Sequence, residues 1–309
     1  MKRDAFTLPL ALAPAEAGCP SAACVPSEIV SLIKRGALFV VNHSGGKDSQ
    51  AMYLMLRDLV PREQLVIVHA DLGAVEWAGA VDHIRATTAS EPLHICRARR
   101  TLLEMIAERG MFPSPQQRQC TSDLKRGPIE RTIRRLGATL VVNCMGMRAE
   151  ESPNRSKLVP FQHVAKKTVQ RRVSKAGKLL HAGREWFEWL PIHNWTEAQV
   201  FERIAAAGQQ PHIVYSLGMT RFSCCFCIMA SEQDLRTAAR LAITRPELLN
   251  DPDLYAKYVG LERSTGQVML MPTKKHGRRT LEEITGISAA PDKPQQPAPA
   301  GFFFGVTAA

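Results

Sequence analysis

The residues of this chain that are best placed to do chemistry are Ser-Gly-Gly-Lys-Asp-Ser at positions 44–49. An apolar stretch precedes them and an apolar-periodic stretch follows, so we expect a loop between a strand and a helix. Glycines let backbone N–H groups converge, and the helix that follows directs unpaired N–H groups and its positive dipole end into the loop. The pattern predicts an anion site, with phosphate as the expected anion.

The polar side chains of this loop have distinct expected roles. Lys47 adds a positive charge, and Ser44 and Ser49 add hydroxyl donors. Asp48 would repel a phosphate, so we expect it to cap the helix or to hold Mg²⁺. The spacing differs from that of the Walker loop and of the dinucleotide fingerprint. A plain Gly-Gly turn is the alternative. The residues expected to hold nucleotide phosphates are Ser44, Gly45, Gly46, Lys47, Asp48 and Ser49, with Lys47 and Asp48 also catalytic.

These residues need a scaffold, and the chain has the length and composition for one. Its 309 residues are 45% hydrophobic, which suits one large α/β domain with an appendage or two small domains. The chain has no uninterrupted apolar run of transmembrane length, so we expect no membrane partner and a cytoplasmic location. Residues 1–27 are rich in Ala and Pro and are expected to form a flexible leader rather than a signal peptide. Residues 288–309 are expected to be a disordered tail.

Buried strands alternate with amphipathic helices along the chain. Strands are expected at residues 38–42, 64–70, 93–96 and 139–145, and helices at 27–34, 77–88, 101–109, 124–136, 196–207, 232–242 and 253–263. This order predicts a doubly wound α/β fold with a mostly parallel sheet and helices on both faces. We assign residues 28–230 to a nucleotide-binding domain and 231–287 to a helical C-terminal extension. Asp71 follows the second strand, where a carboxylate would lie along the ligand crevice, near a ribose hydroxyl, the adenine or a metal.

The net charge of +11 and the pI near 9.5 favour a polyanionic partner such as nucleic acid, although a merely basic enzyme is the alternative. Residues 166–178 form the longest basic cluster and contain no aromatic residue. They are expected to form a mobile loop or hairpin that could contact nucleic acid without stacking on bases.

The 44–49 loop resembles the PP-loop of the ATP pyrophosphatase superfamily, whose fold is called adenine nucleotide α-hydrolase-like. Further stretches narrow the resemblance to the phosphoadenosine phosphosulfate (PAPS) reductase family over roughly residues 36–230. These are residues 69–73, 120–128, 146–155 and 190–196, followed by Arg221 and the cysteines. The resemblance implies an adenine nucleotide, either ATP or a phosphosulfate. It also implies Asp71 near that nucleotide and a catalytic Arg148 facing phosphate or sulfate, with Lys125 and Arg155 as supporting cations.

The cysteines depart from this family pattern. Eight cysteines in a cytosolic protein favour metal or catalytic roles over disulfides. PAPS reductases carry a nucleophilic cysteine near the C-terminus, but here the last cysteine is Cys227. Adenosine phosphosulfate reductases carry a Cys-Cys pair and a later Cys-x-x-Cys on an iron–sulfur cluster. Here only Cys120 stands at the first position and Cys224-x-x-Cys227 at the second. The resemblance therefore implies a [4Fe–4S] cluster on Cys120, Cys224 and Cys227 with one open iron. Buried free thiols are the alternative without a metal, and zinc is the runner-up metal.

Three functions are consistent with these features. The first is ATP-dependent, adenylating sulfur transfer to a nucleic-acid or small-molecule acceptor, with a sulfur donor or redox protein as partner. The second is a PAPS or adenosine phosphosulfate reductase that releases sulfite. The third is a non-catalytic nucleotide-binding subunit of a modification or defence complex.

Overall fold

The computed structural model describes residues 25–88, 91–175, 179–272, 274 and 276–289. Most of the predicted leader, with Cys19 and Cys24, lies outside the described residues, as do Lys178 and the predicted tail beyond residue 289. Among the helices that are described, none is long and apolar enough to cross a membrane.

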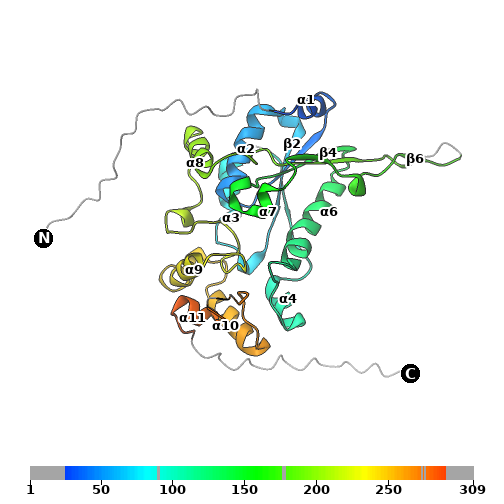
Figure 1. Ribbon diagram of the computed structural model, residues 1–309. Coiled ribbons are helices and arrows are strands. Elements are labelled where there is room, and N and C mark those ends of the chain that lie inside the picture. Colours follow the sequence, from blue (N-terminus) through cyan, green and yellow to red (C-terminus); the bar gives the residue numbers. More distant parts are fainter. Residues whose placement is uncertain (1–24, 89–90, 176–178, 273, 275, 290–309) are drawn as a thin grey trace, which may run out of the picture.

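A six-stranded sheet forms the centre of the molecule (Figure 1). Its order is β3-β2-β1-β4-β8-β5, and all neighbours are parallel except β5, which runs antiparallel to β8. The strands are β1 (Leu38–Asn42), β2 (Leu65–Ala70), β3 (Leu93–Cys96), β4 (Leu140–Met145), β5 (Phe161–His163) and β8 (Glu185–Trp189). The mostly parallel sheet with flanking helices confirms the predicted α/β class.

Helices cover both faces of this sheet because successive strand residues point to opposite sides. Phe39 and Val41 of β1 pack with Met52 of α2 on one face. Val40 packs with Ile133 of α6 on the other face. The helices of this part are α1 (Ser27–Lys34), α2 (Lys47–Leu59), α3 (Ala80–Thr88), α4 (Leu102–Arg109), α5 (Gln119–Thr121), α6 (Gly127–Arg135), α7 (Pro153–Ser156) and α8 (Glu197–Ala206).

The chain order of the strands reverses between β1 and β4. In an open α/β sheet this is where a crevice forms at the carboxyl ends of the strands. The 44–49 loop leaves β1 at this point, and residues 146–148 leave β4 beside it. A β-carbon on Gly146 would lie 3.0 Å from the carbonyl oxygen of Asp48, so the two connections run in close contact.

Several element boundaries differ from the sequence prediction. The helix expected at residues 77–88 begins only at Ala80, because Trp77 instead pairs with Leu249 in an isolated bridge. The helix expected at 124–136 is divided into a π-helical turn, η4 (Ser122–Arg126), and α6. A π-helical turn has one extra residue per turn, which apolar periodicity does not reveal. The edge strand β5 was not predicted, and its three residues are too few for an alternation signal.

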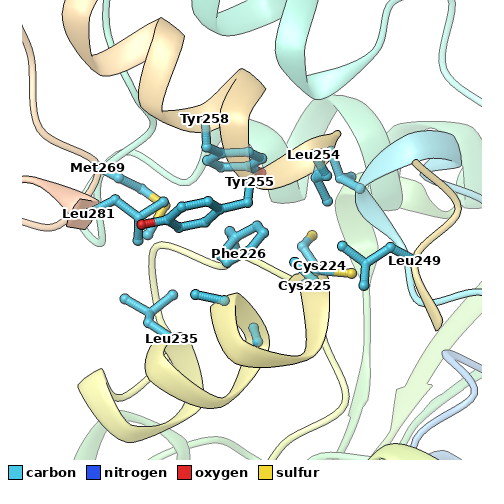
Figure 2. Packing of buried hydrophobic residues seen from close by; sticks show 14 of the residues in the cluster. Cys224, Cys225, Phe226, Leu235, Leu249, Leu254, Tyr255, Tyr258, Met269 and Leu281 are labelled. Atoms are coloured by element: carbon cyan, nitrogen blue, oxygen red, sulfur yellow. The ribbon is translucent and has the colours of Figure 1, made fainter. Parts of the chain in front are cut away.

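The C-terminal part is helical, with α9 (Glu232–Thr244), α10 (Leu254–Thr265) and α11 (Leu281–Thr285). Its apolar side chains share one core with the segment that carries the cysteines. Figure 2 shows Phe226 between the α9 residue Leu235 and the rings of Tyr255 and Tyr258. The Phe226 ring centroid lies 5.5 Å from that of Tyr255 and 5.4 Å from that of Tyr258. The domain boundary expected at residue 230 stays a prediction. Residues before and after this position pack in one core with the cysteine segment.

A two-stranded antiparallel hairpin, β6 (Arg172–Val173) with β7 (Leu179–His181), projects away from the sheet (Figure 1). We call residues 169–175 and 179–184 the arm, because a bridge between Val169 and Arg184 closes its base. In the 166–178 cluster, Arg172 and Val173 thus lie in a hairpin, whereas Lys166 and Lys167 lie in a short turn before it. The remaining short turns are η2 (Arg62–Gln64), η3 (Gly73–Val75), η5 (Ala149–Glu151), η6 (Ala165–Lys167), η7 (Ile213–Tyr215) and η8 (Pro246–Leu248).

Candidate functional site

The two glycines of the 44–49 loop lie directly beneath Phe222. Gly45 has a φ of +86°, a conformation that glycine adopts at little cost, and Gly46 is the N-cap of α2. A β-carbon on Gly45 would be 3.0 Å from the Phe222 ring, and one on Gly46 would be 2.8 Å from the Phe222 Cβ. Both positions therefore exclude a side chain, and Gly45 also requires the left-handed conformation.

The backbone N–H groups at the start of the loop donate to side-chain atoms. The bonds are Ser44 N–H to Ser49 Oγ at 3.2 Å, Gly45 N–H to His43 Nδ1 at 3.1 Å, Gly46 N–H to Ser44 Oγ at 3.4 Å and Lys47 N–H to Tyr215 Oη at 3.1 Å. Burial, with the nearby His69 and His83, lowers the pKa of His43 to about 3, so its neutral ring can accept. Because the acceptors are side chains, an anion could replace them without disturbing β1 or α2.

Lys47 is held in a cage of carboxylates and aromatic rings. Its side chain is 3% exposed, and its ammonium lies 3.3 Å from Asp48 and 3.1 Å from Glu197. The same ammonium lies 5.2 Å from the ring centroid of Tyr215 and 5.8 Å from that of Phe201. These contacts hold the Lys47 ammonium near the loop. Because Glu197 is half-exposed, another anion could take its place beside the ammonium.

Asp48 connects the loop to the end of β4. The Nε of Arg148 donates to a carboxylate oxygen of Asp48 at 2.5 Å, and the Arg148 guanidinium also pairs with Glu150. Burial opposes the charge on Arg148, but the carboxylates of Asp48 and Glu150 outweigh it and raise the pKa of Arg148. Asp48 thus contacts both Lys47 and Arg148. These are the three residues that the sequence predicts to be catalytic.

Further guanidinium groups gather around the same carboxylate. Burial lowers the pKa of Arg155 to about 10, and repulsion by Arg221, Arg118 and Arg148 contributes, while Asp48 acts in the opposite direction. Glu150 pairs with Arg148 and Glu151 with Arg155, whereas no ion pair of Arg118 or Arg221 is found among the described residues. The unpaired guanidinium groups leave positive charge that an oxyanion would neutralise. The sequence analysis did not assign a role to Arg118, which lies in an irregular loop without a motif.

Asp71 faces a different set of partners. It accepts hydrogen bonds from the Gly73 N–H at 2.7 Å and from the Arg97 Nε at 2.7 Å. It lines a small hollow with Arg97, Thr101 and Leu124, and the described lining includes no residue of the 44–49 loop. The nucleotide contact expected of Asp71 remains a prediction.

The three predicted cysteine ligands converge on a lysine. Cys120 comes from α5, and Cys224 and Cys227 come from the segment after Phe222. Burial opposes the charge on Lys125, but the nearby Cys224, Cys227, Glu76 and Cys120 groups raise its pKa. Burial also raises the pKa of the Cys224 thiol to about 12, while Lys125 acts in the opposite direction. The thiols from two separate segments therefore share one space with a buried ammonium group.

This group does not have the geometry of a mononuclear metal site. Among the described residues, no three or more His, Cys, Asp or Glu side chains are arranged to hold a metal ion. The geometry of the described residues therefore supports neither zinc nor an iron–sulfur cluster. The iron–sulfur cluster stays a prediction, which we take up below.

Comparison with known proteins identifies the family. The pattern of the phosphoadenosine phosphosulfate reductase domain matches residues 39–230. The chain belongs to this family. The match begins in β1 and includes the 44–49 loop, which is thus the PP-loop of a PAPS reductase family member, and it ends just beyond the cysteine segment.

Individual relatives are distant. An uncharacterized 37.8 kDa protein from the gpa 5' region of Escherichia phage 186 is 27% identical over 189 residues, which cover 60% of this chain. The match covers 51% of the phage protein, so the chain spans about half the length of that relative.

Solved structures with similar folds have low TM-scores against this chain. A PAPS reductase from Candida auris in a phosphate complex has a TM-score of 0.42 at 16% identity, over 66% of this chain and 90% of that one. An FMN adenylyltransferase from Candida glabrata, bound to FMN and an ATP analogue, has a TM-score of 0.38 at 15% identity, over 61% and 54%.

The PAPS reductase domain places most of the predicted site residues at one edge of the sheet. Lys47, Asp48, Arg148 and Arg155 interact, directly or through one another's charges. Sequence reasoning missed the aromatic residues over the PP-loop, Phe201, Tyr215 and Phe222. Their signal was weak, because residues 201–222 are far from the loop in sequence and only the fold brings them together.

The close packing of Gly46 leads to a prediction about stability. Gly46→Ala would place a methyl group 2.8 Å from the Phe222 Cβ, closer than two carbon atoms can approach. We expect a loss of about 1–3 kcal/mol in the free energy of unfolding, measured by urea denaturation, because overpacking forces Phe222 to move. The double variant Gly46→Ala/Phe222→Ala should recover part of the loss relative to Phe222→Ala alone. A Gly46→Ala variant as stable as the natural protein would contradict this packing.

Proposed function

We propose that this PAPS reductase family protein binds ATP at its PP-loop and uses it to activate an acceptor for sulfur transfer. The loop amides and Lys47 would bind the phosphates, and Asp48 would hold Mg²⁺ once the nucleotide draws Arg148 toward its own oxygens. Arg155 would support Arg148, and Asp71 would contact the nucleoside. The free thiols and the nucleotide chemistry are those of a cytoplasmic enzyme.

The first step in this proposal is adenylation. A carbonyl-derived oxygen of the acceptor attacks the α-phosphorus of ATP, a P–O bond forms, and the bond between the α- and β-phosphates breaks. Pyrophosphate leaves with the bonding electrons. The PP-loop N–H groups and the Lys47 ammonium stabilise the negative charge that develops on it. Arg148, 4% exposed and beside Asp48, would hold the α-phosphate during the attack.

The second step replaces the adenylated oxygen with sulfur. Hydrosulfide attacks the activated carbon, a C–S bond forms, and AMP leaves with the electrons of the C–O bond. The sulfur enters and remains at the sulfide level, so the step needs no oxidant or reductant. Cys120, Cys224 and Cys227 are the donors that would hold a [4Fe–4S] cluster, which when bound supplies an iron site that can bind sulfide.

One observation carries this proposal: three thiols from two segments interact electrostatically with the Lys125 ammonium. Thiolates are the usual ligands of iron–sulfur clusters, and an adjacent ammonium offsets their combined negative charge. A reductase that forms a covalent intermediate on sulfur needs a thiol that ionises readily, whereas burial raises the pKa of the Cys120 and Cys224 thiols.

The decisive experiment uses anaerobically purified protein with Mg²⁺, sulfide and either nucleic acid or no acceptor. Parallel reactions contain [α-³²P]ATP to follow AMP and [γ-³²P]ATP to follow pyrophosphate. We expect AMP and pyrophosphate in equal amounts, with formation dependent on the acceptor. Thioredoxin-dependent release of sulfite from PAPS or adenosine phosphosulfate would instead establish the reductase. Tight ATP binding without turnover under any condition would establish a non-catalytic nucleotide-binding subunit.

A second prediction concerns Tyr215, whose hydroxyl accepts the Lys47 N–H. Tyr215→Phe leaves this buried donor without a partner, so we expect the nucleotide-free protein to lose about 1–3 kcal/mol of unfolding free energy. Saturating ATP should remove most of the difference, because a phosphate oxygen replaces the hydroxyl. The measurement is chemical denaturation with and without ATP.

The matched control for this measurement is Tyr53→Phe. The Tyr53 hydroxyl donates to the Thr88 carbonyl oxygen at 3.0 Å, away from the PP-loop, so ATP should not restore its stability. If the Tyr215→Phe deficit persisted in full at saturating ATP, the phosphates would not occupy the place of the Tyr215 hydroxyl.

A further inference from the structure

Basic side chains, all exposed except the partly buried Arg100, form a band across three neighbouring elements, outside the PP-loop site. We call this band the basic track. It comprises Arg171, Arg172 and Lys175 of the arm, Arg131, Arg134 and Arg135 of α6, and Arg97, Arg99 and Arg100 after β3.

The arm has the composition of an electrostatic contact surface. Between Val164 and Arg184 the sequence contains no Asp or Glu. Arg171, Arg172 and Lys175 are exposed, and within the described part of the chain none of them forms an ion pair. A projecting hairpin with uncompensated charge gains nothing for folding, since its cations only repel one another. The positive charge of the arm is therefore available to an external anion.

The base of the arm is tied to α6. The Lys167 ammonium bridges Glu130 of α6, at 2.8 Å, and Glu188 of β8, at 2.6 Å. The Arg184 guanidinium donates to the carbonyl oxygen of Arg134 at 3.4 Å. A hollow of about 630 Å³ opens at the base of the arm, lined by Arg171 and Arg184 and by the Arg35–Glu185 ion pair. The contacts of Lys167 and Arg184 thus hold the arm beside α6.

From α6 the track continues toward the carboxyl edge of the sheet. A second hollow, of about 560 Å³, is lined by Arg97, Arg99, Arg100, Arg131 and Arg135. Arg99, Arg131 and Arg135 form no ion pair with any described residue. Arg97 closes the hollow at its far end, where it pairs with Asp71 beyond β2. The track therefore runs from the arm to the edge of the sheet that carries the PP-loop.

We propose that the basic track binds the phosphodiester backbone of a nucleic acid and leads that strand toward the PP-loop edge. Rows of arginine and lysine side chains neutralise successive phosphates and release their counterions. The described track has no aromatic side chain between its cations, so binding should depend little on base sequence. This inference deepens the proposed function, since it makes nucleic acid the acceptor, but the binding itself requires no ATP.

The test measures the affinity of fluorescein-labelled 30-nucleotide DNA and RNA, single- and double-stranded and of mixed sequence, by anisotropy from low to physiological salt. The variant Arg171→Gln/Arg172→Gln/Lys175→Gln removes three cations of the arm, and Arg131→Gln/Arg135→Gln removes two of α6. We expect each to weaken binding about tenfold or more. We also expect the salt slope to fall by about one for each phosphate that the variant no longer neutralises.

The matched control is Arg57→Gln/Arg85→Gln/Arg240→Gln, which removes three exposed charges from α2, α3 and α9. It should keep the natural affinity and salt slope, and thermal unfolding should show all variants folded. Equal losses in the control and the track variants would overturn the proposal. Binding of polyglutamate of matched length as tight as that of nucleic acid would also overturn it, in favour of an acidic protein partner.

A separate outcome distinguishes this inference from the proposed function. Pyrophosphate release without any nucleic-acid binding would support the adenylation step and contradict nucleic-acid binding by the basic track. Nucleic-acid binding without any nucleotide turnover would support the basic track and contradict the adenylation step.

Discussion

Lys47→Met is expected to reduce acceptor-dependent pyrophosphate release by about 10²–10³-fold. The Lys47 ammonium is buried within the PP-loop and is the loop's own cation for charge on the leaving pyrophosphate. Methionine keeps the apolar stem that packs against Phe201 and Tyr215, so the loss isolates the charge. The measurement is the initial rate of pyrophosphate formation with ATP, Mg²⁺, sulfide and acceptor.

Two controls make this result interpretable. Lys34→Met removes a charge from the exposed last turn of α1 and should leave the rate unchanged. Urea denaturation of Lys47→Met should show a folded protein, because Glu197 is half-exposed and can be hydrated when its partner is removed. Full turnover by folded Lys47→Met would remove Lys47 from the proposed chemistry.

Cys120→Ala and Cys224→Ala are each expected to abolish the iron content and brown colour of anaerobically purified protein, and with them sulfur incorporation. Each removes one of three thiols that meet around Lys125, and a cluster with two protein ligands is not retained. ATP binding should persist, because the PP-loop contacts involve neither residue. The measurements are iron and zinc content, the visible absorption spectrum and ATP affinity.

Cys96→Ala is the matched control for these variants. The Cys96 thiol is also buried, but it contacts the His69 carbonyl oxygen at 3.4 Å and lies outside the group around Lys125. It should keep full iron content. A natural protein that is colourless and free of iron after anaerobic purification would refute the cluster, whatever the variants show.

The fold could be predicted where burial leaves a clear periodic signal. The strand at residues 93–96 and the helix at 27–34 were predicted with the observed boundaries. Their apolar patterns follow from burial on one or both faces, which is a local property. The prediction failed at η4 and β5, because a π-helical turn and a three-residue edge strand depend on neighbours that the local pattern does not encode.

Sequence alone determined the PP-loop, because Ser44–Ser49 is a contiguous motif whose glycines and helix N-terminus act within a few residues of each other. It also determined the α/β class and the family. Tertiary structure alone decided what surrounds the loop: Tyr215 on the Lys47 N–H, Phe222 over the glycines and Arg118 among the arginines. These contacts join segments separated by many residues, and only the folded sheet brings them within bonding distance.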